Sequence, residues 1–166
     1  ITLDKQDDLQ LLLLQLETSL IGSCCIFQGE ELGLSDVTNI QFDKMKDPWG
    51  LNFYPEFLGR DTCRTPMVWE KNKPMGGFTS ANESWLPISE LHMEKAGLDM
   101  AKSKGSVYNK FSSFLKWRRK QPAMISSNKM SELSGGPSEI IFYRESETQI
   151  LRCKFDFELV EATFEE

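Results

Sequence analysis

The sequence predicts an α/β unit followed by an antiparallel all-β unit. An amphipathic helical segment, residues 5–20, leads through a glycine into a short apolar stretch, residues 24–27, and then into a polar loop with two more glycines. This order of helix, buried strand and Gly-rich loop is one step of an α/β fold. Toward the C-terminus, residues 151–159 alternate strictly between apolar and polar side chains, which is typical of a half-buried antiparallel strand. We therefore expect a domain boundary near residues 122–128.

Size and composition restrict the class of protein. The 166 residues include 40% hydrophobic and 27% charged side chains, with a formal net charge of −6, which is typical of a folded globular protein. The negative balance argues against a nucleic-acid or anionic-membrane partner, because both need clustered positive charge. No apolar stretch reaches the roughly 18 residues of a membrane span, and no signal peptide is visible. The chain starts at Ile1 rather than at Met, so we expect the natural N-terminus to lie upstream.

The first expected helix, residues 5–20, has a capping aspartate in Asp7 or Asp8 and ends before Gly22. Leucines at helical spacing predict its core-facing stripe: Leu9, Leu12, Leu13, Leu16 and Leu20. The apolar stretch 24–27 that follows fits a strand buried on both faces. We interpret its two cysteines as small buried hydrophobic side chains, since the four cysteines show no C-x-x-C spacing.

Two glutamates, Glu30 and Glu31, follow the predicted strand, at the position where ligands bind in α/β folds. One of them can serve as a catalytic acid or base. Adjacent residues on an extended segment point in opposite directions, so the two cannot form a facing catalytic pair. The alternative is that both brace the neighbouring loops.

A long segment, residues 36–87, shows no sustained period and many prolines and glycines, so we expect an irregular loop. Such loops are usually functional or disordered, and its eight aromatic side chains argue for packing rather than disorder. Residues 54–70 combine carboxylates, arginines and aromatic rings. Sugars need that combination, because their C–H faces stack on rings and their hydroxyls pair with charged groups. The alternative is a loop held by Arg–Asp ion pairs. The single histidine, His92, excludes a multi-His metal site and has an expected surface or packing role.

The remaining elements follow from their hydrophobic periods. Residues 106–121 form the second expected helix, capped by Ser106 and ended by Pro122. Residues 139–143 are the expected hairpin partner of 151–159.

Several motifs, in order along the chain, resemble the bacterial α-glucosidases of the α-amylase superfamily, glycoside hydrolase family thirteen, of the oligo-1,6-glucosidase type. Taken together they are highly specific, and they cover nearly the whole chain. The matching residues are 26–34 (IFQGEELGL), 47–50 (DPWG), 55–57 (PEF), 59–61 (GRD), 63–67 (CRTPM) with Trp69, 77–78 (GF), 85–87 (WLP) and 117–123 (WRRKQPA). One departure is Thr62, which stands where glycine is usual.

The resemblance implies a (β/α)8 TIM barrel with its active site on the C-terminal face of the strands. Residues 1–122 would be the C-terminal part of this barrel, namely helix seven, strand eight, a long substrate loop at 34–90 and helix eight. Residues 123–166 would begin a C-terminal antiparallel β domain. A complete barrel needs about 250 residues, so we expect this chain to be a fragment.

The implied activity is retaining hydrolysis of α-glucosidic bonds in oligosaccharides, without a cofactor or metal. The nucleophile, the acid/base and the stabilising carboxylate would lie upstream, so this chain contains no catalytic residue and is expected to be inactive alone. Arg64 would hydrogen-bond the glucose in the cleaved subsite. Glu56, Arg60 and Asp61 would belong to the loop and the cleft wall. Expected partners are the oligosaccharide and the remainder of the barrel, in the cytoplasm. The alternative is a non-catalytic module that binds carbohydrate or a protein partner.

Overall fold

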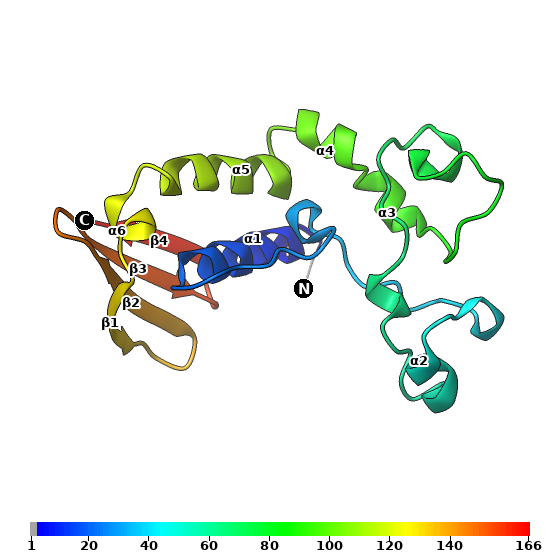
Figure 1. The fold of residues 1–166 in the computed structure, drawn as a ribbon, viewed down its shortest axis with the longest axis horizontal. Coiled ribbons are helices and arrows are strands. Elements are labelled where there is room, and N and C mark those ends of the chain that lie inside the picture. Colours follow the sequence, from blue (N-terminus) through cyan, green and yellow to red (C-terminus); the bar gives the residue numbers. More distant parts are fainter. Residues whose placement is uncertain (1–2) are drawn as a thin grey trace. The chain divides into compact units, whose positions relative to one another are not determined.

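The computed structural model describes residues 3–166, which divide into two compact units (Figure 1). The helix–sheet unit combines the described part of Ile1–Gly33 with Lys104–Glu166. The loop unit is Leu34–Ser103. Along the chain, the loop unit is therefore inserted between the two parts of the helix–sheet unit.

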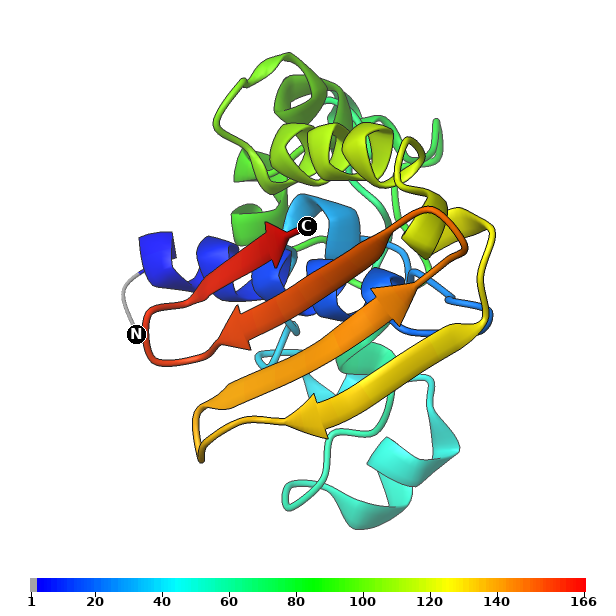
Figure 2. The ribbon, with the colours of Figure 1, turned by 90° about the vertical axis from the view of Figure 1, so that its left-hand side faces the viewer.

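The helix–sheet unit contains α1 (Leu3–Ser19), α5 (Val107–Arg118) and the short α6 (Pro122–Ile125). Its antiparallel sheet has the order β1-β2-β3-β4, seen face-on in Figure 2. The strands are β1 (Lys129–Ser134), β2 (Glu139–Glu145), β3 (Ile150–Asp156) and β4 (Glu161–Glu165). The expected hairpin is confirmed, because β2 and β3 pair along their whole length from Glu139 opposite Asp156 to Glu145 opposite Ile150.

The core of this unit lies between α1 and the sheet, and between α1 and α5. One buried cluster joins α1 and α6 to β2 and β3: Leu12, Ala123, Met124, Phe142, Leu151, Cys153 and Phe155. A second cluster joins α1 to α5: Leu14, Val107, Phe111 and Phe114. The predicted helix at 5–20 is confirmed, but Leu13 and Leu20 are exposed, so the predicted leucine stripe is only partly correct. Burying these apolar side chains is the main source of stability of the unit.

The second predicted helix is confirmed as α5. The Ser106 hydroxyl accepts a hydrogen bond from the backbone N–H of Asn109 at 3.2 Å, as expected of an N-cap. The helix ends at Arg118, two turn residues follow, and Pro122 then occupies the first turn of α6 rather than ending α5 itself.

Two arginines bind the free carbonyl groups at the C-terminus of α1. Arg118 Nε donates to the carbonyl of Thr18 at 2.6 Å. Arg144 is buried and donates at 2.7–3.1 Å to three carbonyls, those of Ser19, Leu20 and Ser127. The last carbonyls of a helix have no partner within the helix and carry partial negative charge, so guanidinium groups stabilise this end.

The predicted buried strand at 24–27 is absent from the described structure. These residues have no regular secondary structure, form no sheet, and leave Cys24, Cys25 and Phe27 exposed. The expectation that the two cysteines are buried is therefore wrong for this chain. The physical reason is that a strand needs neighbours, and no other segment in residues 3–166 pairs with this one.

The predicted boundary near 122–128 is not a division between compact units within this chain, because α1 and α5 share hydrophobic clusters with the sheet. The assignment of residues 1–122 to a barrel and 123–166 to a separate β domain stays a prediction. Among residues 3–166, no helix is both long and apolar enough to cross a membrane.

The loop unit is built from short helices and turns, and none of its residues, all of which are described, forms a strand. It contains α2 (Pro48–Phe53), α3 (Glu90–Glu94), α4 (Gly97–Lys102) and the 3-10 turns Phe42–Lys44, Asp61–Cys63 and Pro74–Gly77. A small core of Val37, Ile40 and Met45 packs against Leu58. The eight aromatic rings of the loop are all exposed, with Trp49 at 63%, so the expected burial of these rings is not found within this chain.

Candidate functional site

The candidate site segment, residues 54–70, is held in place where Asp47–Gly50 meets Gly59–Asp61. Gly59 has a φ of +69°, and a Cβ atom there would lie 2.6 Å from Asp47 Oδ2 and 2.6 Å from the Gly50 backbone N. A Cβ atom at Gly50 would lie 2.5 Å from the carbonyl oxygen of Leu58. Only glycines allow the two segments to approach this closely.

An ion pair between the buried Asp47 carboxylate and the exposed Arg60 side chain joins the two segments. The Asp47 side chain is 1% exposed, and it accepts hydrogen bonds from the Arg60 backbone N–H at 2.6 Å, from Nε at 3.3 Å and from Nη2 at 2.9 Å. These bonds from the Arg60 side chain, and then from its backbone, lower the pKa of Asp47 to about 2. The same pair raises the pKa of Arg60. The alternative in which Arg–Asp ion pairs hold the loop is therefore confirmed for Arg60.

Asp61 is also part of this support. Its carboxylate is buried and accepts hydrogen bonds from the backbone N–H groups of Lys46 at 2.5 Å and Asp47 at 2.8 Å. A buried acceptor with two backbone donors fixes the path of the chain. In this structure Asp61 braces the loop from within and is not available to a ligand.

Thr62 fits without the glycine that is usual at its position. It is not among the non-glycine residues with positive φ in the described chain. Its hydroxyl donates to Asp36 Oδ2 at 3.2 Å, and its carbonyl accepts from the Val37 N–H at 2.9 Å. The departure therefore leaves the local geometry of the loop intact.

Arg64 lies at the C-terminal end of the Asp61–Cys63 turn and is half-buried. Its backbone N–H donates to the Asp61 carbonyl at 3.1 Å. No ion pair joins its guanidinium group to another of residues 3–166, in contrast to Arg60. Glu56 is fully on the surface, between Pro55 and Phe57. The structure thus groups Arg60 and Asp61 around Asp47, whereas the side chains of Arg64 and Glu56 form no ion pair with any of the described residues.

Two residues that sequence reasoning did not assign to the site support it. Asp47 binds both Arg60 and Asp61, the first residue of the Asp61–Cys63 turn. In the sequence, only its position in the DPWG motif pointed to this role. His92 is buried in α3 and lies within hydrogen-bond distance of the Thr65 hydroxyl, next to Arg64. The expected packing role of His92 is confirmed, although nothing in its sequence surroundings identifies its partners.

Glu30 and Glu31 brace a turn in the helix–sheet unit. Glu30 Oε2 accepts from the Phe27 N–H at 3.0 Å, and Glu31 Oε2 accepts from the Gly29 N–H at 2.9 Å. Both carboxylates accept hydrogen bonds from the backbone of their own turn, as the bracing interpretation expects. Among the described residues, no three His, Cys, Asp or Glu side chains gather as a metal site would require.

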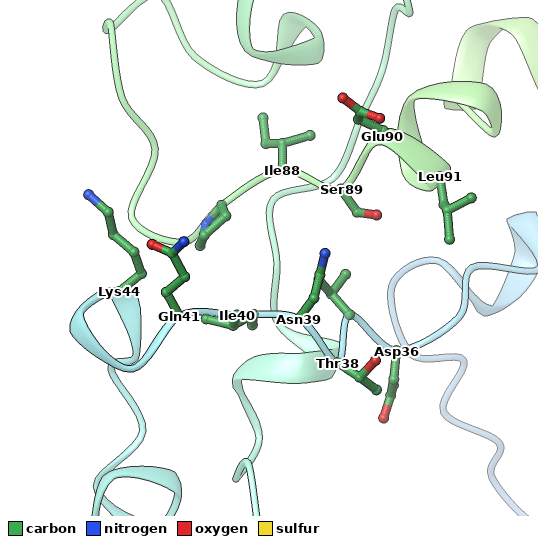
Figure 3. A pocket seen from close by; sticks show the side chains of 12 residues that line it. Asp36, Thr38, Asn39, Ile40, Gln41, Lys44, Ile88, Ser89, Glu90 and Leu91 are labelled. Carbon is green, nitrogen blue, oxygen red and sulfur yellow. The ribbon is translucent and has the colours of Figure 1, made fainter. Parts of the chain in front are cut away.

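The loop unit also has a cavity of about 740 Å³ between residues 36–44 and residues 87–91. Figure 3 shows the segment with Thr38, Asn39 and Gln41 running opposite the segment with Ser89 and Glu90. None of the predicted site residues lines this cavity, so it is separate from Arg64.

The family model described as "Alpha amylase, catalytic domain" matches residues 3–127. The chain therefore belongs to the alpha-amylase family.

Several named proteins of this kind are similar in sequence or structure to the chain. The chain is 45% identical over 113 residues to a "Probable alpha-glucosidase" of Rhizobium meliloti, covering 68% of this chain and 20% of that protein. It is 25% identical over 161 residues to an "Oligo-1,6-glucosidase" of Bacillus cereus, covering 87% and 28%. Among solved structures, an alpha-glucosyl transfer enzyme, XgtA, matches with a TM-score of 0.84 and 35% identity, over 91% of this chain and 28% of that one. The chain thus spans roughly a fifth to three tenths of the length of these relatives.

Proposed function

We propose that this chain is part of a retaining α-glucosidase that hydrolyses α-glucosidic bonds of oligosaccharides. The observation that carries the proposal is the 45% identity to a protein named a probable alpha-glucosidase, within a chain that belongs to the alpha-amylase family. The catalytic carboxylates would come from residues outside these 166. The role of this chain is to supply one wall of the sugar-binding cleft.

In this proposal, residues 24–27 are strand eight of the (β/α)8 barrel, α1 and α5 are helices seven and eight, and β1–β4 begin the C-terminal β domain. The exposed apolar side chains at 24–27 support this assignment, because a parallel barrel strand is covered on both sides. The high TM-score to XgtA over 91% of the chain also supports it.

Arg64 is the proposed sugar-binding residue. Its guanidinium group has five N–H donors and no ion-pair partner among residues 3–166, so it can bind the lone pairs of glucose hydroxyls. The Asp47–Arg60 pair and the buried Asp61 hold the loop beneath it. Because the sugar carries no charge, Arg64 would orient the substrate through hydrogen bonds rather than through an ion pair.

The test is Arg64→Ala in the longer enzyme, assayed on an aryl α-glucoside. Loss of hydrogen bonds from a charged donor predicts a fall in kcat/KM of roughly 10–100-fold. Arg64→Lys should recover part of the loss, because one donor and the charge remain. The matched control is Arg119→Ala, which removes an exposed arginine of the helix–sheet unit and should leave kcat/KM within about twofold. Unchanged kcat/KM in Arg64→Ala would remove Arg64 from the site.

Glucosyl transfer is a second candidate activity, because XgtA is named an alpha-glucosyl transfer enzyme and is 35% identical. Hydrolysis and transfer differ in whether water or a sugar hydroxyl accepts the glucosyl group. Incubation of the longer enzyme with maltose and analysis of the products separates them. Free glucose alone favours hydrolysis, and new, longer glucosides favour transfer.

Measurements on the isolated 166-residue chain distinguish a part of an enzyme from a carbohydrate-binding module. We expect no turnover of an aryl α-glucoside and no tight binding of maltose by calorimetry. Tight maltose binding by the isolated chain would instead favour the non-catalytic carbohydrate-binding module.

A further inference from the structure

The only histidine of the sequence, His92, joins three segments of the loop unit. It is 5% exposed and lies in α3. Its Nε2 is 2.8 Å from the carbonyl oxygen of Ser35, and its Nδ1 is 3.4 Å from the hydroxyl oxygen of Thr65. The imidazole ring thus contacts Ser35, 57 positions before it in the sequence, and Thr65, 27 positions before it.

The hydrogen-bond partners define the tautomer of the ring. The Ser35 carbonyl can only accept, so Nε2 must carry the proton. In the neutral ring Nδ1 is then an acceptor, and the Thr65 hydroxyl donates to it. The ring therefore contributes to holding Thr65 against α3, at a buried site where Thr65 is 4% exposed.

Thr65 directly follows Arg64, so its position constrains the backbone from which the Arg64 side chain extends. On its N-terminal side, the Arg64 backbone is fixed by the hydrogen bond from its N–H to the Asp61 carbonyl. On its C-terminal side, the fixed group is Thr65, which is buried and contacts His92. The Arg64 side chain has no ion-pair partner among the described residues, and its backbone is held on both sides by these two anchors.

We propose that His92 is a positioning residue for Arg64, which acts through the Thr65 hydroxyl and holds the guanidinium group in the orientation that binds the sugar. This inference rests on the proposed function, in which Arg64 contacts the substrate. His92 itself touches no substrate.

The test compares matched variants of the longer enzyme on an aryl α-glucoside. Thr65→Val removes the hydroxyl at almost constant volume, and Thr65→Ser keeps it. His92→Gln places an amide near Nε2 and loses the contact with Thr65, whereas His92→Asn places an amide near Nδ1 and retains it. Thermal melting of each variant reports whether the fold is intact.

We expect Thr65→Val and His92→Gln each to lower kcat/KM roughly 3–10-fold, the effect of one lost hydrogen bond. The double variant should be no worse than either single one, since both remove the same contact. Thr65→Ser and His92→Asn should stay closer to the wild type. In an Arg64→Ala background, none of these changes should lower kcat/KM further.

Two results would overturn the inference while leaving the proposed function standing: wild-type kcat/KM in Thr65→Val and His92→Gln, or an equal loss from His92→Gln with and without Arg64. The second result would show a purely structural role. If Arg64→Ala itself keeps wild-type kcat/KM, the assignment of Arg64 fails, and the role of His92 fails with it.

Discussion

At Asp47, one carboxylate joins two segments that lie thirteen residues apart. It accepts both backbone and side-chain hydrogen bonds from Arg60, and its own N–H donates to Asp61. Hydrogen bonds to an ionised acceptor are stronger than neutral ones, and burial prevents water from competing for them. The loop that carries Arg64 therefore depends on the charge state of Asp47.

This dependence predicts a loss of stability in acid. The pKa of Asp47 is about 2 in the folded state, below the ordinary value of 3.8, so its contribution is present above pH 4 and is lost as the pH falls through about 2. Asp47→Asn should lower the melting temperature by roughly 2–4 °C near neutral pH, and the difference should shrink toward pH 2. Melting curves between pH 2 and pH 7 measure this. The exposed Asp43→Asn is the control, and an equal effect of both variants would contradict the prediction.

Residue types and order were enough to predict that arginine and aspartate hold this loop, but not which ones pair. Arg60 binds Asp47 rather than its neighbour Asp61, because Asp61 is turned inward toward two backbone N–H groups. Pairing across space depends on the two glycines that allow close approach. The alternation or spacing of residues does not encode it.

Among the elements, α1 shows how side chains from a neighbouring helix and strand stabilise the C-terminus of a helix. The helix has no basic residue in its own last turn, and its C-terminal carbonyls are bound instead by Arg118 from α5 and Arg144 from β2. Burial, and then the charge of Arg118, lower the pKa of Arg144, so this arginine is held at a cost in desolvation. Its hydrogen bonds to helix carbonyls offset that cost.

Arg144→Ala should destabilise the protein by about 2–4 kcal/mol, because it leaves three carbonyls without a donor and opens a cavity. Arg144→Met keeps the apolar stem and should lose less. Urea denaturation measures both. The control is Arg152→Ala, which breaks the more exposed ion pair with Glu165 and should cost less than about 1 kcal/mol. Equal losses at both arginines would contradict the role given to Arg144.

The elements that sequence periodicity predicted correctly are those whose partners lie within the chain. α1, α5 and the β2–β3 hairpin bury their apolar faces against one another. Residues 24–27 have an equally clear apolar pattern, yet they form no strand here. A hydrophobic pattern reports the surroundings in which a segment is stable, and in the proposed barrel these surroundings are the neighbouring strands.

At the scale of the whole molecule, the proposed barrel predicts a change in cysteine reactivity. In the 166-residue chain Cys25 is exposed and should react readily with a thiol reagent, whereas burial raises the pKa of Cys153 to about 12 and should keep it unreactive. In the longer enzyme, neighbouring barrel strands should cover residues 24–27 and protect Cys25. Mass spectrometry after timed alkylation measures both rates, with Cys153 as the slow internal control. Equal rates at Cys25 in the two proteins would contradict the assignment of strand eight.

The two-unit organisation has a consequence for how this family can change. The loop unit, Leu34–Ser103, is an insertion of about 70 residues between parts of the helix–sheet unit that pack together as α1 and α5. Closing a loop of this length costs entropy that grows only with the logarithm of its length, so doubling it adds only about 0.6 kcal/mol. Residues can therefore be gained or lost within the insertion while the packing of α1, α5 and the sheet stays the same. Insertions and deletions in this unit can thus reshape the proposed sugar-binding wall without compensating changes in the packed helices and sheet.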